Sequence, residues 1–202
     1  MATLMCAHAK APASTTPRVM VFGDSLSAAY GIQAGQGWVA LMAAALKSDG
    51  VEVINASISG ETTRGGMARI KTDLAQHRPT HVLIALGAND GLRGLPVADT
   101  RKNLQAIVDA VKLADAWPVL IGIQIPPNYG PDYTSQFAAI YSSLAKAQKI
   151  PLVPFLLDGI ADNLDFFQAD RLHPTAEAQP KILQNVLPVL ARAMKPAKTA
   201  AR

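Results

Sequence analysis

The chain has 202 residues, half of them hydrophobic, and carries a formal net charge of +4 at neutral pH. This length and composition fit one globular domain with a sizeable core, and no apolar run approaches the roughly eighteen residues of a membrane span. The single cysteine, Cys6, excludes an internal disulfide bond and a cysteine-rich zinc site, and the scattered lysines and arginines match no nucleic-acid-binding motif.

One domain is predicted over residues 18–195, between two short ends. Residues 1–17 are expected to be a flexible leader, in which Ala7-His8-Ala9 is similar to the end of a cleaved secretory signal but lacks the apolar run that should precede it. The signal-like Ala7-His8-Ala9 favours a periplasmic or secreted protein, and a cytoplasmic location is the alternative. Residues 196–202 are expected to be a solvated basic tail.

Runs of valine, isoleucine and leucine recur along the chain and predict β-strands. They cover residues 19–22, 51–54, 82–86, 119–123 and 152–153. Because each run is continuous instead of alternating with polar residues, each strand is expected to be buried on both faces.

Segments with helical periodicity separate these strands. The apolar positions that share a helix face are 38, 41, 42, 45 and 46, then 104, 107, 108, 111 and 113, then 137, 140, 141 and 144. A last helix is expected over roughly residues 175–194, disturbed by Pro180 and Pro188. The alternation predicts the α/β class, as a three-layer α/β/α sandwich with a five-stranded parallel sheet in a flavodoxin-like order.

Polar loops follow the predicted strands and should gather at one edge, because parallel strands all end on the same side. These loops contain Gly23-Asp24-Ser25, residues 55–62 and residues 87–91, and the segment from Asp170 to His173 precedes the last helix. Ester hydrolysis needs a nucleophile, a base, a group that orients the base, and donors for the oxyanion. The loops offer a candidate for each role.

Ser25 is the candidate nucleophile, and a helix is expected to follow it and to direct backbone N–H groups toward the site. His173 is the candidate base, held in an extended arm because Pro174 disfavours helical geometry before it. Asp170 is placed to hold one imidazole nitrogen so that the other faces Ser25. The candidate oxyanion donors are the N–H groups of Ser25 and Gly60 and the side-chain amide of Asn89.

Other polar residues in these loops are given structural roles. Asp24 and Asp90 are expected to brace their turns through backbone N–H groups. Ser57 and Ser59 are rival nucleophiles but are expected to bond to backbone instead. His81 opens a strand and is expected to be half-buried.

Five stretches resemble, in order and over most of the chain, the conserved blocks of the SGNH (GDSL) hydrolases: GDSLSAAYG, NASISGETT, GANDGLRG, IPPNYG and DRLHPTAEAQP. They are most similar to the bacterial branch with thioesterase, protease and lysophospholipase activities. The family's serine, glycine, asparagine, histidine and aspartate fall on Ser25, Gly60, Asn89, His173 and Asp170. One departure is Ala88, where that branch more often has glycine, and a slightly stiffer loop is expected there.

The resemblance implies a flavodoxin-like fold and a periplasmic serine esterase that needs no metal or cofactor. It implies acyl thioesters, lysophospholipids and aryl esters as substrates. Five residues either line an acyl groove or pack the loops: Leu92, Leu95, Ile125, Pro126 and Tyr129. The alternatives are an esterase for carbohydrate or peptidoglycan O-acetyl groups, an inactive lipid-binding module and a flavodoxin-like nucleotide binder. The oligomeric state is left open, a monomer included.

Overall fold

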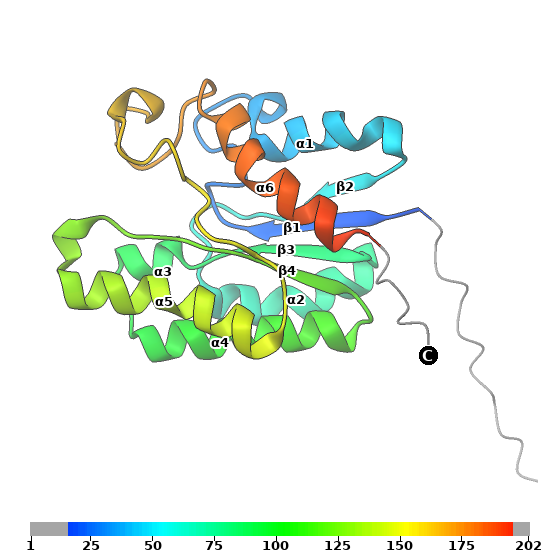
Figure 1. Cartoon of the computed structure of the whole chain (residues 1–202), viewed down its shortest axis with the longest axis horizontal. Helices are drawn as coiled ribbons and strands as arrows, with labels where there is room; N and C mark the ends of the chain where they lie inside the picture. Colours follow the sequence, from blue (N-terminus) through cyan, green and yellow to red (C-terminus); the bar gives the residue numbers. More distant parts are fainter. Residues whose placement is uncertain (1–15, 196–202) are drawn as a thin grey trace, which may run out of the picture.

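The computed structural model describes residues 16–195, where a five-stranded parallel sheet is covered by helices on both faces (Figure 1). This three-layer arrangement confirms the predicted α/β/α class. The predicted leader, apart from its last two residues, and the predicted basic tail lie outside the described residues.

The strand order is the flavodoxin-like order that was predicted, β2-β1-β3-β4-β5. The strands are β1 (Arg18–Gly23), β2 (Glu52–Asn55), β3 (His81–Ala85), β4 (Trp117–Ile121) and β5 (Leu152–Val153). The central strands β1, β3 and β4 are buried over almost their whole length. The prediction of full burial was wrong for β2, which lies at the sheet edge and keeps both of its end residues exposed.

Two helices cover one face of the sheet and four cover the other (Figure 1). The first face carries α1 (Trp38–Leu46) and α6 (Gln179–Ala193). The second carries α2 (Thr63–His77), α3 (Ala88–Leu92), α4 (Val97–Leu113) and α5 (Pro131–Gln148). Short 3₁₀ turns lie at Ala34–Gln36, Lys47–Asp49, Pro127–Tyr129 and Leu164–Phe166.

The observed helices differ in several details from those predicted by periodicity. Helix α6 begins at Gln179, later than predicted, and Pro180 stands in its first turn, where a missing N–H costs nothing. Leu113 ends α4 and is 84% exposed, so it does not belong to the buried face. In α1 the buried face uses Val39, whereas Ala45 is exposed.

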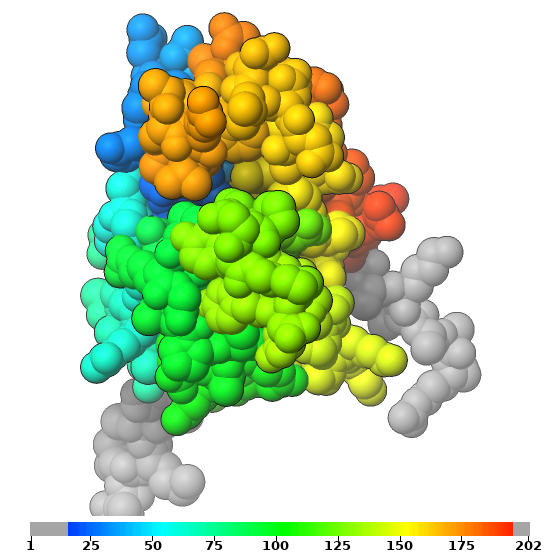
Figure 2. All heavy atoms as spheres, turned by 90° about the vertical axis from the view of Figure 1, so that its left-hand side faces the viewer, coloured from blue at the N-terminus to red at the C-terminus, as the bar shows by residue number. Residues whose placement is uncertain are grey.

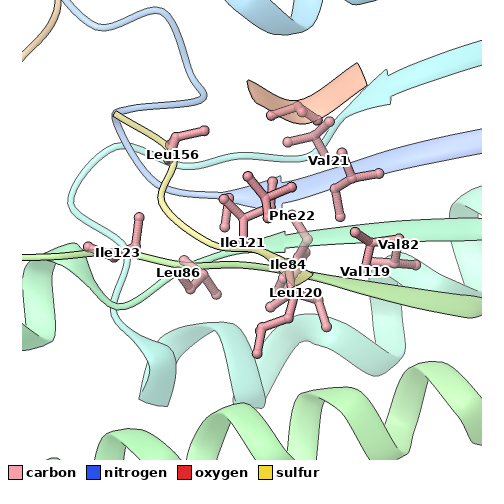
Figure 3. Packing of buried hydrophobic residues seen from close by; sticks show 14 of the residues in the cluster. Val21, Phe22, Val82, Ile84, Leu86, Val119, Leu120, Ile121, Ile123 and Leu156 are labelled. Carbon is pink, nitrogen blue, oxygen red and sulfur yellow. The ribbon is translucent and has the colours of Figure 1, made fainter. Parts of the chain in front are cut away.

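The core lies where the central strands meet the helices, and Figure 3 shows its side chains packed along β1, β3 and β4. Phe22 pairs in register with Ile84, which pairs with Leu120, and all three side chains are fully buried. Full burial of each such side chain stabilises the fold by roughly 1.5–3 kcal/mol. The carboxyl ends of these strands are therefore firmly fixed. No helix among residues 16–195 is long and apolar enough to cross a bilayer.

Candidate active site

Ser25 lies in a loop that leaves the carboxyl end of β1 without forming a helix. Successive turns follow it: the N–H of Ala28 donates to the carbonyl of Asp24 at 3.0 Å, and that of Tyr30 donates to the carbonyl of Ser25 at 3.4 Å. The positive φ angles of Ala29 (58°) and Gly31 (74°) stop these turns from continuing as a helix. The prediction of a helix directly after the nucleophile was therefore wrong.

Asp24 anchors this loop from inside the protein. Its side chain is fully buried, and one carboxylate oxygen accepts the N–H of Leu26 at 3.0 Å. The other oxygen has no hydrogen-bond partner among the described residues. Burial, with smaller contributions from the charges of Asp90 and Glu61, raises the pKa of Asp24 to about 7. The bracing role predicted for Asp24 is confirmed.

His173 lies in an arm, residues 167–174, that folds back on itself. Phe167 and Pro174 form an antiparallel bridge, and the N–H of Gln168 donates to the carbonyl of His173 at 2.8 Å. The side-chain amide of Gln168 donates to the carbonyls of Tyr30 (2.8 Å) and Pro174 (3.1 Å), so it joins this arm to the Ser25 loop. His173 stands ahead of the last helix, as predicted, but residues 169–173 form turns and bends instead of extended backbone.

Ser25, His173 and Asp170 form a chain of two hydrogen bonds. Ser25 Oγ lies 2.9 Å from His173 Nε2, and His173 Nδ1 lies 2.6 Å from Asp170 Oδ2. Since a carboxylate only accepts, Nδ1 donates to Asp170 and Nε2 is left to accept the hydroxyl of Ser25. The contacts predicted from the sequence are therefore present.

Asp170 is fixed by its own loop. Its Oδ1 accepts the backbone N–H groups of Leu172 at 2.9 Å and His173 at 3.0 Å. Desolvation raises the pKa of Asp170, but the hydrogen bonds and charge from His173 and the Leu172 N–H together lower it to about 2. The carboxylate is thus ionised throughout the neutral range and holds the imidazole in one orientation.

Two residues of this site were missed by the sequence analysis. The ring of Tyr30 packs against the imidazole of His173, with ring centroids 4.3 Å apart, and Gln168 ties the two loops together. Tyr30 belongs to the GDSLSAAYG block, but neither its side chain nor that of Gln168 has a chemistry that marks it for a catalytic role.

The candidate oxyanion donors come from three loops at the same sheet edge. Asn89 stands in the first turn of α3, and its Nδ2 donates to the carbonyl of Glu61 at 2.9 Å, which leaves its second N–H for another acceptor. Gly60 has φ of 79°, and a Cβ at this position would meet only open space. Its carbonyl accepts from Arg93 at 3.2 Å, which braces the loop.

The backbone N–H groups of Ser25 and Gly60 donate to no protein acceptor within residues 16–195. Unsatisfied N–H groups are uncommon in folded proteins unless water or a ligand takes them. Both are therefore available to a bound oxygen atom.

The remaining polar candidates have structural surroundings. Asp90 accepts the N–H of Thr63 at 2.8 Å and its hydroxyl at 2.5 Å, so it joins its loop to the start of α2 and does not brace its own turn through backbone N–H groups as predicted. Ser57 Oγ is buried without a hydrogen-bond partner in the described chain, so the predicted bond to backbone is wrong. His81 is partly buried at the start of β3, as predicted, and this burial lowers its pKa.

A cavity of about 510 Å³ opens beside Ser25, Asn89 and His173. Figure 2 looks onto this edge, where a crease runs between the gold and orange atoms of residues 155–173 and the green atoms below them. Much of the cavity wall is apolar and comprises Leu92, Ile123, Ile125, Pro126, Phe155, Leu157, Leu164 and Phe167.

Only part of the expected acyl groove lies on this wall. Leu92, Ile125 and Pro126 line the cavity, whereas Leu95 and Tyr129 do not. The hydroxyl of Tyr129 donates to the carbonyl of Leu92 at 2.8 Å, and the carbonyl of Leu95 accepts from a second tyrosine hydroxyl at 2.7 Å. These two residues therefore hold the loops together.

A flavodoxin-like sheet that carries a serine, a histidine and an aspartate in hydrogen-bonded contact at its carboxyl edge has the architecture of the SGNH (GDSL) hydrolases. The model of the GDSL-like lipase/acylhydrolase family matches residues 21–179. The chain therefore belongs to this family and is an acylhydrolase.

Individual relatives agree with this assignment. The esterase TesA of Pseudomonas aeruginosa is 45% identical over 174 residues, which cover 85% of this chain and 87% of that protein. Thioesterase 1/protease 1/lysophospholipase L1 of Escherichia coli is 42% identical over 170 residues, which cover 84% of this chain and 81% of that protein. A crystal structure of TesA superimposes with a TM-score of 0.85 at 44% identity, covering 88% of this chain and 99% of that one.

Proposed function

We propose that this protein is a serine esterase that cleaves acyl esters and thioesters through a covalent acyl-enzyme. The observation that carries the proposal is the hydrogen-bonded chain from Ser25 through His173 to Asp170, which opens into a cavity with a largely apolar wall. An apolar wall suits the hydrocarbon part of an acyl group. The thioesterase and esterase names of the relatives support the same class of substrate.

Acylation starts when His173 Nε2 takes the hydroxyl proton and Ser25 Oγ attacks the carbonyl carbon. The developing oxyanion accepts hydrogen bonds from the N–H groups of Ser25 and Gly60 and from the free N–H of Asn89. Asp170 stays ionised and stabilises the imidazolium that forms.

Collapse of the tetrahedral intermediate breaks the bond to the leaving oxygen or sulfur, which receives the proton from His173. A water molecule then attacks the acyl-enzyme with His173 again as base. The carboxylic acid is released and Ser25 recovers its proton.

The experiment is a series of p-nitrophenyl esters from acetate to laurate, measured with the Ser25→Ala variant as the blank. Loss of the nucleophile should lower kcat by up to ~10⁶-fold, the size found in another serine hydrolase. Ser57→Ala is the matched control, because it removes a buried serine hydroxyl that makes no hydrogen bond. Its kcat should stay close to that of the unmodified protein.

The chain-length profile separates the candidate functions. A rise of kcat/KM toward medium or long chains supports the acyl groove. A sharp maximum at acetate supports an O-acetyl esterase instead. Hydrolysis no faster than the blank for every ester contradicts the proposal and leaves a binding function.

A further inference from the structure

Arg171 is the one residue with a permanent positive charge on the wall of the cavity beside Ser25. It stands in the loop between Asp170 and His173, and its backbone has φ of 58°, in the left-handed region that non-glycine residues seldom adopt. Its N–H donates to the carbonyl of Gln168 at 2.8 Å, which helps hold this conformation. The loop thus fixes the backbone position of Arg171, from which its side chain extends.

The guanidinium of Arg171 is unpaired in the described part of the chain: it forms no ion pair with a carboxylate and no side-chain hydrogen bond. Two acids, Asp158 and Asp162, line the same cavity without pairing with it. Among the charged side chains on this wall, the two carboxylates repel an anionic group and Arg171 attracts it. The charges therefore favour one position for such a group.

That position lies on the leaving-group side of the reaction. His173 must hand its proton to the leaving oxygen or sulfur, so the leaving group passes along the loop that carries both His173 and Arg171. The apolar residues Leu92, Ile125 and Pro126 come from other loops, and Leu157, Leu164 and Phe167 add apolar wall from the segment that leads to Arg171. Arg171 stands two residues before His173, so its charge is carried by the same loop that protonates the leaving group.

We propose that Arg171 is a specificity residue that selects substrates whose leaving alcohol or thiol carries a phosphate. A guanidinium pairs with phosphate through two parallel N–H···O bonds, which a neutral leaving group cannot match. The phosphate can belong to a lysophospholipid head group or to the thiol carrier of an acyl thioester. This assignment rests on the proposed esterase function of the same site.

The test compares three lauroyl substrates below the concentrations at which they form micelles: lauroyl lysophosphatidylcholine, lauroyl coenzyme A and the uncharged monolauroylglycerol. The measured quantity is kcat/KM for each phosphate-bearing substrate divided by that for monolauroylglycerol. This ratio should fall ~10-fold in Arg171→Gln, the loss expected for a solvated charged hydrogen bond, and be only partly restored in Arg171→Lys, which keeps the charge but not the paired N–H donors. It should also fall with added salt in the unmodified protein and in Arg171→Lys, but not in Arg171→Gln.

Two further variants act as controls. Arg171→Gly suits a positive φ angle and keeps the loop folded, so it should lower the ratio as Arg171→Gln does. Arg101→Gln removes an exposed arginine from the surface of α4 and should leave the ratio unchanged.

The outcomes are distinct. A fall for one phosphate-bearing substrate alone supports the proposal and identifies the source of the phosphate. An unchanged ratio for both, with all three substrates still hydrolysed, overturns the role of Arg171 and leaves the esterase function standing. If the unmodified protein hydrolyses none of the three, the esterase function itself fails.

Discussion

At Asn89, one amide group is placed to do two things. One N–H of its Nδ2 holds the carbonyl of Glu61, and the other is available to the substrate. The same interaction therefore positions the donor and the loop that carries Gly60. A neutral amide suits this role because it cannot compete with His173 for the proton.

Replacing Asn89 by alanine should lower kcat by ~10²–10³, because loss of one oxyanion donor costs about 3–4 kcal/mol in the transition state. KM should change little, since the charge on the substrate oxygen develops only after binding. Steady-state kinetics with a p-nitrophenyl ester gives both constants. Arg93→Gln is the control. It removes the hydrogen bond from Arg93 to the Gly60 carbonyl but none of the three proposed oxyanion donors. A change confined to KM would assign Asn89 to substrate binding alone.

The contacts between Ser25, His173 and Asp170 were predictable because few residue types can act as nucleophile, base and orienting acid. Asp170 stands three residues before His173, a spacing that allows the carboxylate to fold back onto the imidazole. Tyr30 and Gln168 were not predictable in this way. A tyrosine and a glutamine serve many structural purposes, and their value here depends on loops that meet only in the folded chain.

At the scale of elements, the arm of residues 167–174 holds His173 in place through the bridge of Phe167 and Pro174 and the N–H groups that Asp170 accepts. The arm is tied to the rest of the site by Gln168, whose amide reaches the carbonyl of Tyr30 across the cavity edge. Because Tyr30 also packs against His173, Gln168 and Tyr30 add to the hold that Asp170 has on the imidazole.

Gln168→Leu keeps the volume of the side chain and removes both of its amide hydrogen bonds. Unfolding free energy should fall by ~1 kcal/mol, since two hydrogen bonds are lost, one of them exposed to solvent and one half-buried. The kcat should fall ~10-fold or more because His173 is less well held. Thermal unfolding and steady-state kinetics measure the two effects. A loss of stability with unchanged kcat would show that the arm positions His173 without Gln168.

Periodicity predicted most strands and helices but failed where backbone conformation is decided residue by residue. The segment after Ser25 is rich in alanine and serine and has no breaker before Gly31. It nevertheless forms only turns, because the left-handed conformation of Ala29 prevents a helix. Alanine seldom adopts this conformation, so composition gives no warning of it.

For the whole molecule, the buried carboxyl of Asp24 makes stability depend on pH. Its pKa is about 7 in the folded protein against 3.8 for an ordinary aspartate, so the folded state binds this proton more tightly than the unfolded chain. The stability it contributes is fully present below pH 3.8 and is lost as the pH rises through about 7. The difference amounts to on the order of 4 kcal/mol.

Asp24→Asn should therefore flatten the dependence of unfolding free energy on pH between about 4 and 7. The asparagine oxygen can still accept the N–H of Leu26, and its uncharged amide has no proton to lose. Urea unfolding at several pH values measures the slope. The slope is the test, because a buried amide without a partner adds a cost that is the same at every pH. If unfolding free energy depends on pH in the same way in Asp24→Asn and in the unmodified protein, the raised pKa of Asp24 is contradicted.

The parallel sheet also separates the site from the two ends of the described chain. Arg18 lies beside Thr80 at the amino edge of the sheet, and Ala193 and Met194 line one hollow with Thr80 and His81 at that edge. Ser25 follows the carboxyl end of β1 at the opposite edge, and His173 contacts it there. A tether joined at the amino edge of the sheet would hold the molecule on the side opposite the active site. The opening of the cavity would then point away from the tether. Molecules fixed densely on a bead or fused to a larger partner in this way would not obstruct one another's substrates.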